Sequence, residues 1–183
     1  MKVYTRKGDD GTTGLLFGGR AGKDEPGPES YGAVDEAVSA LGLARAQTEA
    51  DSELYELLVR LQRELFVVGA ELATAPANRH KLQPEVSLVT AEMVTRLEPL
   101  IDDVTTRFDA PTEFVLPGEN PVAAALDLAR AIVRRAERAS VAATRAGWLA
   151  AESQVVPYLN RLADLVYTLA RWQEGHFRAV RER

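Results

Sequence analysis

The N-terminal segment holds the first residues whose types and spacing could do chemistry. Residues 4–14 read Tyr-Thr-Arg-Lys-Gly-Asp-Asp-Gly-Thr-Thr-Gly, and residues 18–20 read Gly-Gly-Arg. Glycines let backbone amides converge on an anion, while threonine hydroxyls and Lys7 add donors and positive charge. No Gly-Lys-Ser/Thr follows, so the segment is not a Walker A loop. Two interpretations stay open, a phosphate-binding arm and a flexible tail whose glycines only permit turns.

A second group of residues follows helical spacing in the later half of the chain. Asp127, Arg130, Arg134 and Glu137 are separated by three, four and three residues, which places them on one stripe of a helix together with Arg138. On a surface helix, such a stripe is typical of solvated ion pairs that contribute little. The apolar segment Phe-Val-Leu-Pro-Gly at 114–118 comes just before this helix, and it favours a functional interpretation.

A third group lies near the C-terminus. Asn160, Asp164, Tyr167 and Arg171 are spaced to share a polar helix face opposite a leucine face. Asn160 falls in the first turn, where backbone donors remain free. The spacing alone favours a capping or tertiary role for this group.

The elements that must position these groups are predicted to be helices. Apolar residues recur at helical spacing, and short β-like sequence occurs only at 2–5 and 113–116. Residues 22–30, with Pro26 and Pro28, are typical of a linker. The periodicity therefore predicts an all-α bundle with a glycine-rich arm. The predicted helices span 31–47, 52–75, 87–106 with a kink at Pro99, 121–146, and 155–181, the last roughly 40 Å long.

Composition excludes several classes of protein. The chain has 183 residues, no cysteine and two histidines, so disulfide scaffolds, thiolate chemistry and histidine-rich metal sites are ruled out or disfavoured. The net charge of −5 offers no positive field for nucleic acid or an anionic membrane. No apolar run approaches a membrane span, and the N-terminus lacks the apolar core of a secretory signal. We expect one cytoplasmic domain over 1–183, with an arm and linker at 1–30 and the bundle at 31–183.

Four ordered motifs carry a resemblance to a known family. They are TRKGDDGTTGLLFGGR at the N-terminus, GAVDEAVSALG, FVLPG followed by LARAIVRRAER, and VPYLNRLADLVYTLAR near the end. Together they resemble the PduO-type ATP:cob(I)alamin adenosyltransferases over nearly the whole chain. This resemblance implies a five-helix bundle that assembles as a homotrimer, with ATP and the corrinoid bound between neighbouring subunits.

The same resemblance implies roles for individual residues. Arg134, Glu137 and Asn160 would complete an ATP site, together with the N-terminal arm. The residues of the arm that would bind ATP are Thr5, Lys7, Gly8, Asp9, Gly11, Thr12, Thr13, Arg20 and Lys23.

Three further residues would act at the interface and at the corrin. Asp35 would pair across the subunit interface with Arg130, and Phe114 would face the lower axial side of the corrin. Catalytic roles therefore fall on Arg134, Phe114, Asp35 and Arg130.

The activity implied is transfer of the 5′-deoxyadenosyl group of ATP to the cobalt of cob(I)alamin, with release of triphosphate. Mg²⁺ would bridge phosphate oxygens, while the identity of the protein's own metal ligands stays unknown. An adenosylcobalamin-dependent mutase and a reductase are the expected partners. A cobalamin carrier that delivers the finished cofactor is the alternative function, and a purely structural helical oligomer is a weaker one.

Overall fold

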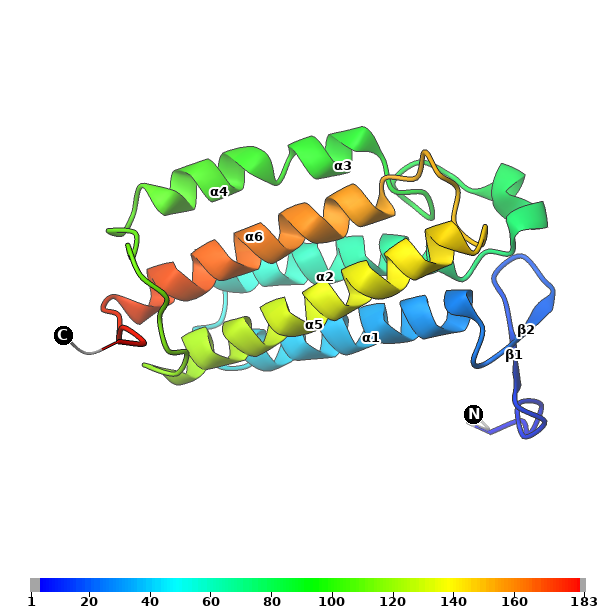
Figure 1. The fold of residues 1–183 in the computed structure, drawn as a ribbon, viewed down its shortest axis with the longest axis horizontal. Coiled ribbons are helices and arrows are strands. Elements are labelled where there is room, and N and C mark those ends of the chain that lie inside the picture. The colour runs from blue at the N-terminus through cyan, green and yellow to red at the C-terminus, as the bar shows by residue number, and fades with distance from the viewer. Residues whose placement is uncertain (1–3, 182–183) are drawn as a thin grey trace.

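The chain folds as a bundle of long helices with a small hairpin at one end. The computed structural model describes residues 4–181, and Figure 1 shows the helices side by side with the hairpin beside the N-terminus. Helix α1 packs on α2 and α5, α5 packs on α6, and α3 and α4 lie along α6. The elements are β1 (Thr12–Gly14), β2 (Arg20–Gly22), α1 (Pro26–Arg45), α2 (Glu53–Leu72), the 3-10 helix η1 (Pro76–Lys81), α3 (Ala91–Thr95), α4 (Glu98–Thr105), α5 (Pro121–Arg145) and α6 (Val155–Glu174).

The buried core confirms the apolar helix faces that the periodicity of the sequence predicts. Helix α2 begins at the N-cap Ser52, whose hydroxyl accepts a hydrogen bond from the Tyr55 amide, and its leucine face is buried. The inner faces of α1 and α5 are rich in alanine, which lets these two helices approach closely. No helix in the range 4–181 is long and apolar enough to cross a membrane.

The linker predicted over 22–30 is wrong for residues 26–30, because α1 already begins at Pro26 and only residues 23–25 connect it to β2. A proline is tolerated in the first turn of a helix, where the backbone N–H has no intrahelical acceptor. Gly27 is required there for space, since a Cβ at this position would lie 2.0 Å from Cε2 of Trp148. The Trp148 indole donates to the Leu72 carbonyl at 2.8 Å, so one side chain ties the start of α1 to the ends of α2 and α5.

The helix predicted over 87–106 is divided, so the described part of the chain has six α-helices rather than five. Helix α3 starts at Ala91, and a break at Leu97 separates it from α4, where Pro99 falls in the first turn. Proline forces such a break because it lacks the amide that would continue the first helix.

The last helix is also shorter than predicted. It ends at Gly175, which has a left-handed φ of 71°. Its 20 residues give a length of about 30 Å rather than 40 Å. The residues beyond turn back, and Ala179 forms an antiparallel bridge with Val115.

The β-like segment at 2–5 is not a strand where it can be followed. Lys2 and Val3 lie outside the described residues, and Tyr4 and Thr5 are not in a strand. Strand structure occurs instead in the antiparallel pair β1–β2, where Thr13 faces Ala21.

We expect Gly27→Ala to lower the free energy of unfolding by about 1–3 kcal/mol, because the added methyl overlaps the indole of Trp148. Urea unfolding followed by tryptophan fluorescence measures this loss. Glu29→Ala, at an exposed position of the same helix turn, is the control and should change stability by less than about 0.5 kcal/mol. Equal stability of the two variants would contradict the packing role of Gly27.

Candidate active site

The N-terminal arm is a hairpin closed by its own cations. Arg20 donates through Nε to the Thr12 hydroxyl at 2.9 Å and through its guanidinium to the Lys7 carbonyl. The Lys23 ammonium donates to the Gly8 carbonyl at 2.8 Å. These contacts favour a defined structure for the arm over a flexible tail.

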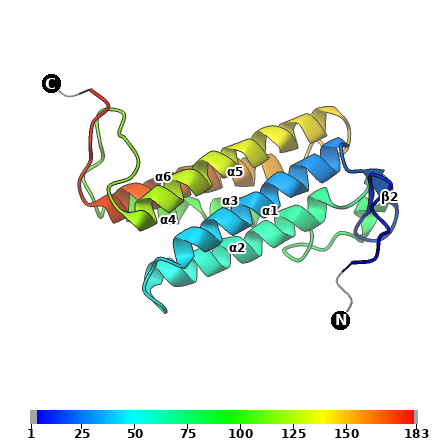
Figure 2. The same cartoon turned by 90° about the horizontal axis from the view of Figure 1, so that it is seen from below.

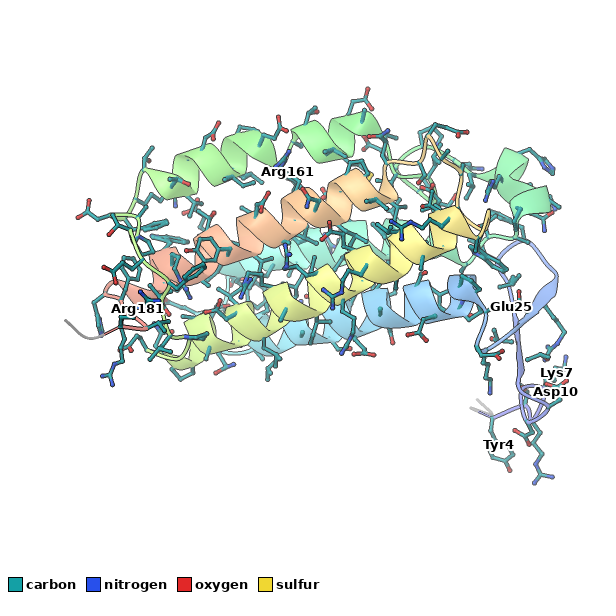
Figure 3. The ribbon with its side chains drawn as sticks, in the orientation of Figure 1. Tyr4, Lys7, Asp10, Glu25, Arg161 and Arg181 are labelled. Atoms are coloured by element: carbon teal, nitrogen blue, oxygen red, sulfur yellow. The ribbon has the colours of Figure 1, made fainter. Side chains whose placement is uncertain are left out.

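The acidic side chains of the arm differ in their contacts. Asp10 accepts from the amide and the hydroxyl of Thr12 at 3.0 and 2.8 Å, and these hydrogen bonds lower the pKa of Asp10. The Asp9 side chain is exposed. Figure 3 shows Lys7 and Asp10 at the outer end of the arm, away from the bundle. This end of the arm is open to solvent, so an anion that entered there would contact Lys7 and backbone amides.

The polar stripe of α5 departs from a solvated row of ion pairs at its first residue, Asp127, while Arg134 and Arg138 are exposed. Asp127 is buried and pairs with Arg171 of α6, which is 1% exposed. Arg171 also donates to Glu174 at 3.0 Å, so one buried guanidinium bridges two buried carboxylates. The polar face predicted for α6 is therefore wrong at Arg171, which points into the bundle.

Burial raises the pKa of Glu174; Arg171 opposes this shift, and the nearby Asp127 adds to it. Arg171 is thus the buried positive charge that pairs with both carboxylates inside the protein. Arg130 approaches the outer side of Asp127, with its Nε 3.4 Å from Oδ1.

Phe114 stands above this network, in a loop before α5. It is 90% exposed and lines a cavity of about 450 Å³ together with Asp127, Arg130, Tyr167 and Arg171. The Arg130 and Arg171 guanidinium carbons lie 5.9 and 5.2 Å from the centre of the Tyr167 ring. An exposed aromatic ring beside a charged cavity is a surface that could cover an apolar ligand face while polar groups bind its rim.

Backbone pairing fixes the loop that carries Phe114. The Phe114 carbonyl accepts from the Val180 amide at 2.9 Å, and the Leu116 amide donates to the Arg178 carbonyl at 2.8 Å. The residues after α6 therefore hold the Phe114 loop from one side.

Three of the expected ATP-site residues come together on α5 and α6. Asn160 donates from Nδ2 to Oε1 of Glu137 at 3.1 Å, and Arg134 is exposed one helical turn from Glu137. The Arg134 carbonyl accepts from the Arg138 guanidinium at 3.0 Å. The Arg134 side chain is thus presented on the surface beside the Glu137–Asn160 pair.

Asp35 and Arg130 do not meet within one chain. Helices α1 and α5 are antiparallel neighbours, and Glu36, next to Asp35, pairs with Arg135. Arg130 lies five residues nearer the start of α5, about 8 Å further along the helix. Asp35 is exposed and lines a groove of about 480 Å³ between α1 and α2, where Phe66 is 67% exposed.

The arm and Phe114 lie at opposite ends of the bundle. The arm leads into α1, whose first turn contacts the C-terminal half of α5 through the Ser30 hydroxyl and the Ala139 carbonyl, 3.1 Å apart. Phe114 precedes the other end of α5. Figures 1 and 2 show the hairpin at one end of the bundle and the start of α5 at the other, and Figure 3 places Lys7 and Arg181 at opposite ends of the molecule.

Sequence reasoning missed the residues that hold the hairpin and that complete the cavity. Asn78 and Lys81 approach the carbonyls of residues 17 and 18, some sixty residues earlier in the chain. Thr112 and Glu113 line the Phe114 cavity. No regular spacing in the sequence connects these four residues to the site. Only Thr112 and Glu113 could have been found, because they directly precede Phe114.

Comparisons with known proteins show which family the chain belongs to. A family model described as cobalamin adenosyltransferase matches residues 3–173, so the chain belongs to the cobalamin adenosyltransferase family. A corrinoid adenosyltransferase of Citrobacter freundii is 40% identical over 173 residues, covering 94% of this chain and 95% of the relative. One of Bacillus subtilis is 40% identical over 175 residues, covering 93% and 86%. The resemblance drawn from the four motifs is confirmed.

Solved structures of a PduO-type ATP:corrinoid adenosyltransferase from Lactobacillus reuteri are similar to this fold. One is complexed with cobalamin and ATP and has a phenylalanine replaced by histidine; its TM-score is 0.81 at 32% identity, over 94% of this chain and 91% of that chain. Another is complexed with ATP and has an arginine replaced by lysine; its TM-score is 0.79 at 32% identity, over 94% of each chain.

We expect Arg171→Met to destabilise the protein by about 3–5 kcal/mol at pH 7, because Asp127 and Glu174 would face each other without the buried cation. Burial already raises the pKa of Glu174, and loss of Arg171 would raise the pKa of Glu174 in the folded variant further above its unfolded value. The folded state would bind more protons than the unfolded state, so the stability of the variant should rise as the pH falls from 7 towards 5.

Urea unfolding at the two pH values measures this effect. Arg63→Met, at an exposed position of α2, is the control and should change stability little at either pH. A loss for Arg171→Met that does not shrink at the lower pH would contradict the assignment of Arg171 as the counter-ion.

Proposed function

We propose that the chain is an ATP:corrinoid adenosyltransferase that joins the 5′-deoxyadenosyl group of ATP to the cobalt of cob(I)alamin. One observation carries this proposal: this member of the family has two distinct surfaces that suit the two substrates. One is the exposed Phe114 above a charged cavity, and the other is the glycine-rich hairpin with its cations. The first suits an apolar face of a corrinoid, and the second suits a triphosphate.

The reaction forms a cobalt–carbon bond and breaks the bond between C5′ and O5′ of ATP. Cob(I)alamin supplies the electron pair, and inorganic triphosphate leaves with the electrons of the broken bond. Cob(I)alamin is a strong nucleophile, so no side chain has to act as a base. The protein's tasks are to orient C5′ towards cobalt, to stabilise the leaving group, and to make the reduced cobalt accessible.

Phe114 performs the last of these tasks in our proposal. An axial ligand on the lower face of the corrin stabilises Co(II), and an exposed phenyl ring fills that space without offering a donor atom. Excluding the ligand raises the Co(II)/Co(I) potential and brings it within reach of cellular reductants. The backbone bonds from the residues after α6 would hold the ring in place.

The triphosphate would be bound by Arg134 and by the arm. Arg134 presents a planar fork of donors beside Glu137 and Asn160, and a guanidinium can hold two phosphate oxygens at once. We assign the arm residues Thr5, Lys7, Gly8, Asp9, Gly11, Thr12, Thr13, Arg20 and Lys23 to the same site. Arg20 and Lys23 also donate to the Lys7 and Gly8 carbonyls, so in this site they would hold the shape of the hairpin as well as add positive charge.

Mg²⁺ would enter with the nucleotide. Residues 4–181 contain no group of three or more His, Asp or Glu side chains arranged as metal ligands. Mg²⁺ commonly rests on phosphate oxygens with one or two carboxylates, so this chain fits an ion held mainly by ATP. Its positive charge would offset the charge that develops on the leaving triphosphate.

We also infer that the active unit is a homotrimer with sites between neighbouring chains. Asp35 is exposed beside an apolar groove and is offset from Arg130 of its own chain, which supports pairing with Arg130 of another copy. The whole chain would act as one cytoplasmic domain. A reductase would supply cob(I)alamin, and an adenosylcobalamin-dependent mutase would consume the product.

The conversion of cob(I)alamin to adenosylcobalamin tests the function directly. The purified protein, ATP and pre-reduced cob(I)alamin should give the spectrum of the alkylated cofactor and one triphosphate per turnover. Tight binding of adenosylcobalamin without any turnover would instead indicate a carrier, and absence of ATP binding would contradict both roles.

We expect Arg134→Lys to lower kcat/KM for ATP by at least ~10-fold, a loss of about 1.4 kcal/mol, because lysine keeps the charge but not the two-pronged contact. Steady-state kinetics with pre-reduced cob(I)alamin measures it. Arg138→Lys, one turn further along α5, is the matched control. Unchanged kinetics for Arg134→Lys would contradict the phosphate-binding role and would indicate that Arg134 is only part of a solvated row of ion pairs.

We expect Phe114→Ala to slow the reaction from cob(II)alamin with a mild reductant far more than the reaction from pre-reduced cob(I)alamin. The alanine leaves room for an axial ligand, while the ATP site is untouched. The signal of four-coordinate Co(II) in the spectrum of the ATP-loaded complex should weaken. Because the ring is 90% exposed, the melting temperature should change little. Equal impairment in both assays would refute the axial role.

A further inference from the structure

The tip of the N-terminal hairpin, residues 15–19, is fixed to the bundle at a place remote from Lys7 and Asp10. The Leu16 amide donates to the Ala73 carbonyl at 2.9 Å, just beyond the end of α2. Asn78 of η1 donates from Nδ2 to the Gly18 carbonyl at 3.2 Å. The Lys81 ammonium lies 2.9 Å from Oδ1 of Asn78 and 3.5 Å from the Phe17 carbonyl.

The backbone of the hairpin tip has an uncommon conformation. Phe17, Gly18 and Gly19 have φ values of 63°, 96° and 94°. Glycine adopts this region freely, but a phenylalanine there is strained and depends on the contacts around it. The Leu15 amide donates to the Gly19 carbonyl at 3.1 Å, which closes the turn. This turn leaves the carbonyls of residues 17 and 18 free to accept from η1.

The outer part of the arm has no comparable attachment. Among the described residues, the hydrogen bonds and ion pairs of residues 7–14 run only to residues 5–23. The outer part is therefore positioned through β1 and β2, and these strands are held at the hairpin tip and at the start of α1. A change at the tip would displace every phosphate-binding group of the arm together.

We propose that Asn78, supported by Lys81, is a positioning residue for nucleotide binding. It touches neither nucleotide nor corrinoid, and it acts by holding the hairpin tip, which keeps Lys7 and the arm amides close to the phosphates that they would bind. This inference rests on the proposed function of the arm. A looser arm would have to be ordered by the ATP that binds it, so binding weakens while the reaction of bound ATP is retained.

We expect Asn78→Ala to raise KM for ATP by ~5-fold, with kcat at saturating ATP within about twofold of the unaltered protein. Asn78→Asp keeps the size of the side chain and the acceptor for Lys81 but lacks the donor, so it should raise KM as well. His80→Ala, at an exposed position of the same short helix, is the matched control and should leave both constants unchanged.

Amide hydrogen exchange on the protein without ATP gives a second readout. The Leu15, Leu16 and Gly18 amides should exchange faster in Asn78→Ala than in His80→Ala, while exchange in the middle of α2 stays the same. Unchanged exchange at the tip, or an unchanged KM in an active enzyme, would overturn the proposal. If the unaltered protein failed to bind ATP, the proposed ATP-binding function of the arm would be refuted, and so would the role of Asn78 in ATP binding. Faster exchange would then show only a structural anchor.

Discussion

The length of α5 is the constraint on which the proposed site depends. Its 25 residues span about 38 Å, with Phe114 before one end and the arm beside the other. Transfer of an alkyl group requires C5′ and cobalt in contact, whereas our proposal places the nucleotide at the arm and the corrinoid on Phe114, at opposite ends of one chain. If both surfaces serve one reaction, they must come from two copies. The offset between Asp35 and Arg130 within the chain has the same consequence.

Each end of the bundle is stabilised by a different kind of interaction. At the Phe114 end, Arg171 neutralises Asp127 and Glu174 inside the bundle, and Arg130 and Tyr167 extend this network to the surface. Removing one partner of such a network leaves buried charge, so its members depend on one another. At the arm end, Trp148 packs against Gly27, and η1 holds the hairpin tip. The two halves of the proposed site are therefore stabilised by separate sets of contacts.

Much of the fold could be predicted because it follows from local periodicity. The leucines of α2 and α6 and the stripe of α5 placed the long helices, and the stripe put Arg134 and Glu137 on one face of α5. The family resemblance, and not the spacing, joined Asn160 of α6 to these two residues, and Asn160 bonds to Glu137. The wrong predictions concern positions where tertiary contacts determine whether a residue is helical or buried. The Trp148 contact accommodates Pro26 and Gly27 in a helix, and the partnership with Asp127 buries Arg171 on a helix face that looks polar. The opposite placement of arm and Phe114 follows from topology, which spacing alone does not reveal.

Mixing two impaired variants tests the central claim that each site is built from two chains. Lys7→Ala removes the charge of the arm, and Phe114→Ala removes the ring at the other end. Each would be assayed alone and after joint refolding, with ATP, cob(II)alamin and a mild reductant. We predict that the mixture is more active than either variant, because some interfaces then combine an intact arm with an intact Phe114. Activity of the mixture no higher than the average of the two variants, with mixed oligomers verified by mass spectrometry, would contradict the shared site.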